Sequence, residues 1–183
     1  MLRFQDALSP RWRRVIQRSS DGRMDSNGFA WGIPYRWGCT LILYRHDRKR
    51  RWGGKPIADW NDLLLPGLER RIALMDDPRE IIGIVLKTLG MGYNASSADL
   101  AACGITEEEL SERMRHLMSQ TRVISNKDHV RAYAAGDVDV IVGNSDDLLP
   151  LAQMSSHSTL IAPASGTSLW ADLWCIPSTA AGG

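Results

Sequence analysis

The chain has 183 residues, of which 44% are hydrophobic and 23% charged, and its formal net charge is +1. This length is enough for one domain with a sizeable core, or for one full lobe plus part of another. The balanced charge gives no overall indication of nucleic-acid or membrane binding. No apolar run reaches the roughly 18 residues of a membrane-spanning helix. The N-terminus lacks the apolar segment of a secretory signal, so we expect a cytosolic or organellar protein, or a true N-terminus further upstream.

The sequence contains none of the common spacings that mark a metal site or a catalytic motif. The three cysteines and four histidines are widely separated, without a CxxC or HExxH pattern, so we expect no structural metal site and no disulfide framework. The chain also lacks a GxSxG motif, a P-loop and a dinucleotide-binding glycine pattern. We therefore assign no catalytic residue and no cofactor.

The first third of the chain predicts a short helix followed by an extended segment. Ser9 before Pro10 is typical of a helix start, although the basic beginning also resembles a transit peptide. Residues 29–44 are expected to be extended, and Pro34 indicates an edge or crossing strand. The basic run 45–55 is interpreted as a solvated loop, and residues 59–64 as a short capped helix.

The most informative stretch is an acidic corner between a predicted buried strand and a predicted helix. Apolar residues 72–75 precede Asp76 and Asp77, and Pro78 then suits the first position of a helix that runs to about Leu89. Asp77 would cap this helix, with Glu80 completing a capping box. The same carboxylates would also lie where ligands bind in α/β sheets, and the two roles are compatible.

Strands and helices alternate along the rest of the chain, which favours an α/β fold with a mainly parallel sheet. In the second predicted long helix, Leu110, Met114, Leu117 and Met118 form an apolar stripe that we expect in the core. Asn126 is expected to cap the following helix. The predicted elements are a loop 91–104 with a helical turn at 97–102, helices 107–120, 126–135 and 147–153, strands 122–124, 138–142 and 159–162, and a final extended segment 168–177.

The final extended segment contains a carboxylate between two tryptophans. Trp170, Asp172 and Trp174 would share one face of a strand, because alternate residues point the same way. Burying an unpaired carboxylate is costly. Asp172 should therefore meet a cation, which is either a ligand ammonium group or an arginine such as Arg36 or Arg79.

Five stretches, in the same order and with similar spacing, resemble those of a known family. The chain resembles the bacterial extracellular solute-binding proteins of the spermidine/putrescine type, which deliver polyamines to an ATP-binding-cassette importer. The stretches are residues 33–40 (IPYRWGCT), 60–63 (WNDL), 76–80 (DDPRE), 136–138 (GDV) and 166–177 (GTSLWADLWCIP).

The resemblance implies a periplasmic-binding-protein-like fold of type II, in which two α/β lobes joined by crossing strands close on a ligand. Residues 1–38 would be the end of lobe one, residues 39–168 would be lobe two, and residues 169–183 would return to lobe one. Most of lobe one would then be missing from the chain. The implied partners are a polyamine and the membrane permease of the transporter, with no nucleic acid, and the implied location is the periplasm.

The resemblance also implies ligand-binding positions. Asp77 and Glu80 would bind amines, Trp170 would pack on the aliphatic chain, and Asp172 would pair with an ammonium group. Asn144 stands where relatives often have a tryptophan, so it would remove an aromatic wall and offer an amide. This departure leaves open another solute, such as a metal chelate or an amino compound. Also open are a truncated chain that binds nothing and, least supported, an enzyme that uses Asp77 and Glu80 as an acid/base pair.

Overall fold

The computed structural model describes residues 10, 13, 16–177 and 179. The chain divides into two compact units, one formed by residues 38–169 and the other by residues 1–37 together with 170–183. The helix predicted from about residue 10 falls largely outside the described residues.

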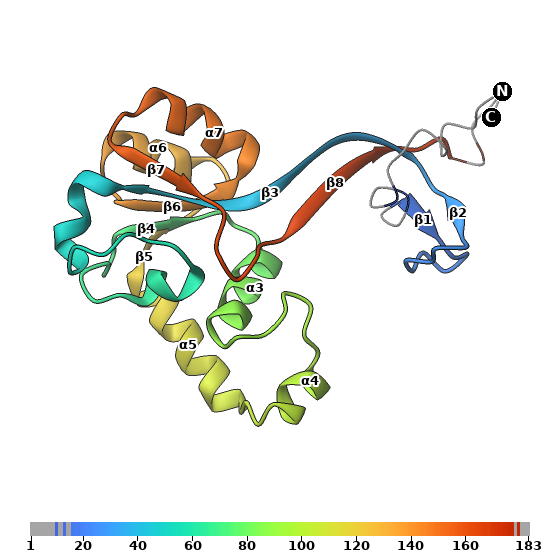
Figure 1. Cartoon of the computed structure of the whole chain (residues 1–183), viewed down its shortest axis with the longest axis horizontal. Helices are drawn as coiled ribbons and strands as arrows, with labels where there is room; N and C mark the ends of the chain where they lie inside the picture. The colour runs from blue at the N-terminus through green and yellow to red at the C-terminus, as the bar shows by residue number, and fades with distance from the viewer. Residues whose placement is uncertain (1–9, 11–12, 14–15, 178, 180–183) are drawn as a thin grey trace. The chain divides into compact units, whose positions relative to one another are not determined.

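The larger unit is built on a sheet with the strand order β5-β4-β6-β3-β7 (Figure 1). These strands are β3 (Ile33–Arg45), β4 (Ile72–Leu74), β5 (Thr121–Ile124), β6 (Val140–Asn144) and β7 (Ser158–Ile161). Strand β4 is parallel to both β5 and β6, whereas β3 is antiparallel to its neighbours β6 and β7. Strands β4 to β7 therefore run one way and β3 runs the other, which confirms the predicted α/β fold with a mainly parallel sheet.

Helices cover both faces of this sheet (Figure 1). Ile42 packs with the short helix η2 and with helices α3 and α5, while its neighbours Leu41 and Leu43 pack with α6 and α7. The alternation follows from the pleat of the strand. The helices are η1 (His46–Trp52), η2 (Trp60–Leu64), α3 (Pro78–Thr88), α4 (Ser97–Ala102), α5 (Glu107–Gln120), α6 (Asp128–Ala135) and α7 (Ser145–Met154). Among the described residues, none of the helices is long and apolar enough to cross a membrane.

The smaller unit contains a two-stranded sheet of β1 (Gln17–Arg18) and β2 (Phe29–Ala30), which pair antiparallel. Strand β8 (Leu169–Trp174) pairs with β3. The chain thus passes between the units along β3 and returns along β8. The assignment of the two units to two lobes of a longer binding protein stays a prediction.

The basic run of residues 45–55 is not the solvated loop that we predicted. It forms the 3-10 helix η1, in which Trp52 is buried, and two of its arginines bind a fully buried carboxylate. Arg48 and Arg51 each lie 2.7 Å from an oxygen of Asp139, which is 0% exposed. A buried carboxylate requires such partners, and the carboxylate lies 91 residues from Arg48, so the local sequence could not reveal the pairing.

The predicted cap of α6 was also wrong. Ser125 Oγ accepts the amides of Lys127 and Asp128 at 3.2 and 3.0 Å, while the Asn126 side chain turns to Asp76. Asn126 Oδ1 accepts the Asp76 amide, and Asn126 Nδ2 donates to the Asp76 carbonyl oxygen, both at 3.0 Å. Asn126 therefore joins the ends of strands β4 and β5.

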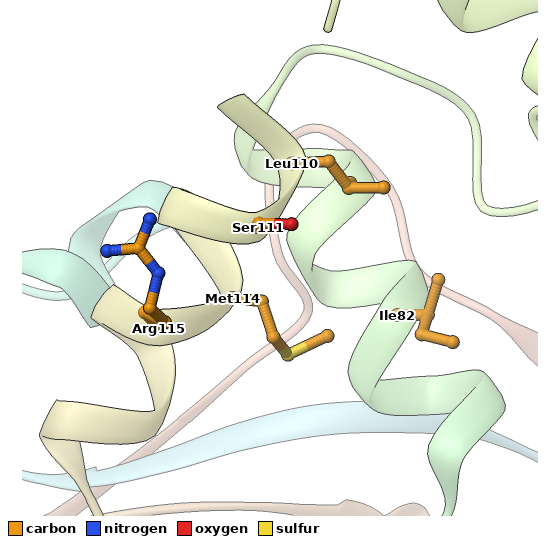
Figure 2. Close-up of a pocket in the computed structure, with 5 residues that line it drawn as sticks. All are labelled: Ile82, Leu110, Ser111, Met114 and Arg115. Carbon is orange, nitrogen blue, oxygen red and sulfur yellow. The ribbon is translucent and has the colours of Figure 1, made fainter. Parts of the chain in front are cut away.

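The apolar stripe of α5 is only partly in the core. Leu117 is fully buried, whereas Leu110, Met114 and Met118 are partly buried against the core cluster. Ile82 of α3 and the α5 residues Leu110, Ser111, Met114 and Arg115 line a groove of about 470 Å³ (Figure 2).

Candidate functional site

The parallel strands of the larger unit end at one edge of the sheet, which we call the carboxyl edge. Leu74 of β4 lies opposite Val142 of β6 and Ile124 of β5, so the residues that follow these strands emerge together. They include Asp76 and Asp77 after β4, Ser125 and Asn126 after β5, and Asn144 at the end of β6. Polar side chains at this edge are placed where α/β proteins bind ligands.

Asp77 occupies the helix-capping position that the sequence predicted. Its Oδ1 accepts the amides of Arg79 at 2.9 Å and of Glu80 at 3.3 Å, at the start of α3. These bonds satisfy backbone donors that would otherwise lack a partner in the first turn.

Glu80 does not complete the predicted capping box, because its carboxylate turns to two hydroxyl groups. Glu80 Oε2 accepts from Thr40 Oγ1 at 2.8 Å and from Ser168 Oγ at 2.7 Å, and the two hydroxyls are 2.9 Å apart. Thr40 is 0% exposed. Both donors are neutral hydroxyls, so they fix the position of the carboxylate without bringing a positive charge to it.

Sequence reasoning missed Thr40 and Ser168. They lie in β3 and just before β8, next to the points where the chain enters and leaves the larger unit. Thr167 Oγ1 also donates to the Thr40 carbonyl oxygen at 2.5 Å. The one signal in the sequence is a threonine that directly precedes the apolar run 41–44, where a fully buried strand would normally continue with apolar residues.

Asn144 is brought to the same corner, because it lies opposite Thr40 in the ladder between β3 and β6. It is also the residue before α7, yet within the described part of the chain its side chain makes no capping hydrogen bond. Its half-buried amide therefore stands beside the Thr40–Glu80 pair. Asp146 and Asp147 follow in the first turn of α7 and are exposed, which keeps the corner acidic.

The aromatic residues near Glu80 are tightly packed. The Tyr93 ring packs edge-on against Trp60 at a centroid distance of 6.2 Å and lies over Gly83, where an added Cβ would be 2.1 Å from Tyr93 Cδ1. Burial, followed by the negative charge of Glu80, raises the pKa of Tyr93. The phenol therefore stays neutral, and α3 is held firmly against η2.

The remaining predicted residues lie in the smaller unit, where Arg36 connects them. Arg36 Nε is 2.6 Å from Asp172 Oδ2, and the Arg36 guanidinium carbon is 5.5 Å from the centre of the Trp170 ring. Trp174 instead packs edge-on against Tyr35, at 5.1 Å. Arg36 is thus one of the two internal partners that the sequence suggested for Asp172.

This ion pair is accessible, since the side chains of Arg36 and Asp172 are 58% and 49% exposed. An exposed pair of this kind contributes little to stability and leaves the carboxylate open to exchange of partners.

No group of three or more His, Cys, Asp or Glu side chains that could hold a metal ion occurs among the residues that the structure describes.

A comparison with protein families shows which family the chain belongs to. A family model described as bacterial extracellular solute-binding protein matches residues 3–182. The chain belongs to this family. Its members are binding proteins, a non-enzymatic class, so the prediction of a solute-binding protein rather than an enzyme is confirmed.

Among curated proteins, the chain is 26% identical over 150 residues to the spermidine/putrescine-binding periplasmic protein of Salmonella typhimurium. This match covers 82% of the chain and 40% of the relative. The chain is also 30% identical over 103 residues to the putrescine/cadaverine-binding protein of Pseudomonas aeruginosa, covering 51% of the chain and 29% of that protein. The chain therefore spans less than half the length of these relatives.

The solved structures agree with this fold. The crystal structure of a spermidine/putrescine ABC transporter substrate-binding protein from Streptococcus pneumoniae superposes with a TM-score of 0.74. The match covers 97% of this chain and 49% of that chain at 21% identity. The family model, the curated relatives and the shared fold together confirm the predicted resemblance to the spermidine/putrescine type of solute-binding protein.

Proposed function

We propose that the chain contributes most of one lobe, with its connecting strands, to a substrate-binding protein that captures a polyamine such as spermidine or putrescine for an ABC importer. The observation that carries this proposal is the Glu80 carboxylate, held by the hydroxyls of Thr40 and Ser168 at the carboxyl edge. Within the described part of the chain its hydrogen-bond donors are neutral hydroxyls, so a ligand cation can supply the opposite charge.

The chemistry of polyamines suits the other residues of this edge. A polyamine is a chain of ammonium groups separated by methylenes, and carboxylates at intervals bind such groups by charge-assisted hydrogen bonds. Asp77 would offer a second carboxylate beside Glu80, and Asn144 an amide oxygen. Asp146 and Asp147 would add negative potential.

Trp170 and Asp172 would supply an aromatic face and a further carboxylate. Arg36 now lies against both, at the positions that a ligand methylene chain and a ligand ammonium group would take. A guanidinium stacked on an aromatic ring and paired with a carboxylate imitates an organic cation. We propose that a ligand amine replaces Arg36 on Asp172.

The names of the relatives support the same assignment. The curated relatives from Salmonella typhimurium and Pseudomonas aeruginosa are named for spermidine, putrescine and cadaverine, and the first is named as periplasmic. We accordingly propose a periplasmic location and a transporter permease as the partner.

A second candidate is a different small solute on the same scaffold. Asn144 favours it, because an amide without a capping role in the described structure can bind a hydroxyl or carbonyl group as well as an amine. The solute would then carry fewer ammonium groups than spermidine.

Titration calorimetry tests the proposal. Spermidine and putrescine are titrated into the purified chain at low and at physiological salt, alongside Glu80→Gln and Asp172→Asn. We expect saturable 1:1 heat that survives physiological salt, and a loss of affinity of tenfold or more in each variant, since hydrogen bonds to charged groups contribute roughly 1.5–3 kcal/mol.

Glu112→Gln is the matched control, because Glu112 is an exposed carboxylate of α5 away from the carboxyl edge. Its affinity should equal that of the unmodified chain. Weak heat that salt abolishes equally in all four proteins would overturn the proposal. Tighter binding of a neutral amino compound than of either polyamine would favour the second candidate.

A further inference from the structure

The opposite edge of the same sheet, where β4 and β6 begin, is strongly basic. We call it the amino edge; it comprises η1 and its continuation to Lys55 together with the segments that precede β4 and β6. Tyr44 at the end of β3 lies opposite Val140 at the start of β6, which brings η1 to this edge. Gly67 packs directly against the Arg51 carbonyl, which adds the segment before β4. The basic residues of the amino edge are Arg45, Arg48, Lys49, Arg50, Arg51, Lys55, Arg70 and Arg71, and its acidic residues are Asp47, Glu69, Asp137 and Asp139.

Part of this positive charge serves the fold. Arg48 and Arg51 neutralise the buried Asp139, and Arg48 also donates to the Gly136 carbonyl oxygen at 3.2 Å. Arg45 donates to the Tyr133 carbonyl oxygen at 2.8 Å and lies over the Tyr133 ring. These contacts fix η1 against the end of α6.

Four other basic side chains of the amino edge have no such function in the described structure. Lys49, Arg50, Lys55 and Arg70 are exposed, and within the described residues none of their side chains forms a hydrogen bond or an ion pair. Since η1 is anchored by Asp139, Lys49 and Arg50 are presented on a fixed helix rather than on a mobile loop. The chain as a whole is nearly neutral, at +1, so this positive charge is local.

An exposed apolar side chain borders the same edge. Met154, which is 85% exposed, lines a pocket of about 280 Å³ together with Arg45 and Tyr133. An exposed methionine beside basic side chains could add one apolar contact to a surface that binds mainly through its charge.

We propose that the amino edge binds the surface of a membrane rich in anionic lipids. Four unpartnered cations spread along one edge suit an extended layer of negative headgroups, which needs no converging pocket. Each basic side chain held near an anionic bilayer strengthens binding about fivefold. The binding would be weak, reversible and sensitive to salt.

Vesicle sedimentation with the full chain tests this proposal. The vesicles contain phosphatidylcholine alone or phosphatidylcholine mixed with phosphatidylglycerol. We expect the chain to sediment with the mixed vesicles only, and added salt to release it. The double variant Lys49→Ala/Arg50→Ala should bind about 25-fold more weakly, as two basic side chains are removed.

Lys127→Ala/Arg131→Ala is the matched control, because both residues are exposed cations at α6, and Lys127 follows Asn126 at the carboxyl edge. It should bind like the unmodified chain. Equal weakening in both double variants, or no sedimentation of the unmodified chain at low salt, would overturn the proposal. Displacement from vesicles by double-stranded DNA at an equal phosphate concentration would also overturn it, since the edge would then be a general polyanion surface. The assay involves no polyamine, so its outcome is independent of the function proposed above.

Discussion

The two edges of the central sheet each hold a carboxylate away from bulk water, but they balance its charge differently. At the amino edge, the fully buried Asp139 is paired with Arg48 and Arg51. At the carboxyl edge, the partly buried Glu80 accepts bonds from the neutral hydroxyls of Thr40 and Ser168. A carboxylate neutralised by internal cations has a structural task. A carboxylate oriented by neutral donors can still accept a cation, and this is why we propose the carboxyl edge as the one that binds a cationic ligand.

The largest expected effect comes from the internally neutralised carboxylate. Asp139→Asn removes the negative charge and leaves Arg48 and Arg51 without their partner. We expect the free energy of unfolding in urea to fall by about 3–5 kcal/mol, because two hydrogen bonds to a charged group, each contributing roughly 1.5–3 kcal/mol, are lost or weakened.

The control for this prediction is Asp47→Asn, since Asp47 is an exposed acid of η1, the helix that also carries Arg48 and Arg51. It should change the free energy of unfolding by less than about 0.5 kcal/mol. Equal effects of the two substitutions would mean that the amino edge does not depend on the buried ion pairs.

The next effect concerns the hydroxyls that hold Glu80. Thr40→Val keeps the shape of the side chain but removes the hydroxyl bonded to Glu80 and Ser168. We expect a loss of about 1–3 kcal/mol in urea unfolding, because polar partners are left unsatisfied. Combining Thr40→Val with Glu80→Gln should cost less than the sum of the two single changes. Strict additivity would show that the two side chains do not act together.

A smaller effect separates the two roles of Asp77. Asp77→Ala removes the helix cap and should lower the free energy of unfolding by about 1 kcal/mol, whereas Asp77→Asn should preserve it, because asparagine caps equally well. If Asp77 also binds a ligand cation, both variants lose affinity for putrescine in calorimetry. Full affinity in Asp77→Asn would leave Asp77 with the capping role alone.

The smallest effect on stability is expected from the exposed pair of the smaller unit. Asp172→Asn removes the partner of Arg36, and we expect a change in the free energy of unfolding of less than about 1 kcal/mol. A weaker response to putrescine in this variant would then report binding and not unfolding. A loss of several kcal/mol would instead make Asp172 a structural residue.

Local patterns predicted much of the fold and part of the candidate site. The buried strand before Asp76, the proline at the start of α3 and the cap by Asp77 are all set by neighbouring residues, and the structure has them as expected. The acidic corner was recognised for the same reason.

What the sequence could not predict depends on contacts between distant segments. Glu80 lies 40 residues from Thr40 and 88 residues from Ser168, so its turn away from the helix start had no local signal. The same holds for the arginines that reach Asp139. Asn126 was misassigned because its amide satisfies the backbone of Asp76, 50 residues away, instead of its own helix.

The connection at the carboxyl edge depends on the amide chemistry of the single side chain of Asn126. Its side chain uses an acceptor toward the Asp76 amide and a donor toward the Asp76 carbonyl oxygen. Deamidation would convert that donor into a second acceptor facing a carbonyl oxygen, and would add a negative charge beside Asp76 and Asp77. A molecule deamidated at Asn126 would have lost half of the connection between the ends of β4 and β5, at the same corner that the ligand is proposed to use.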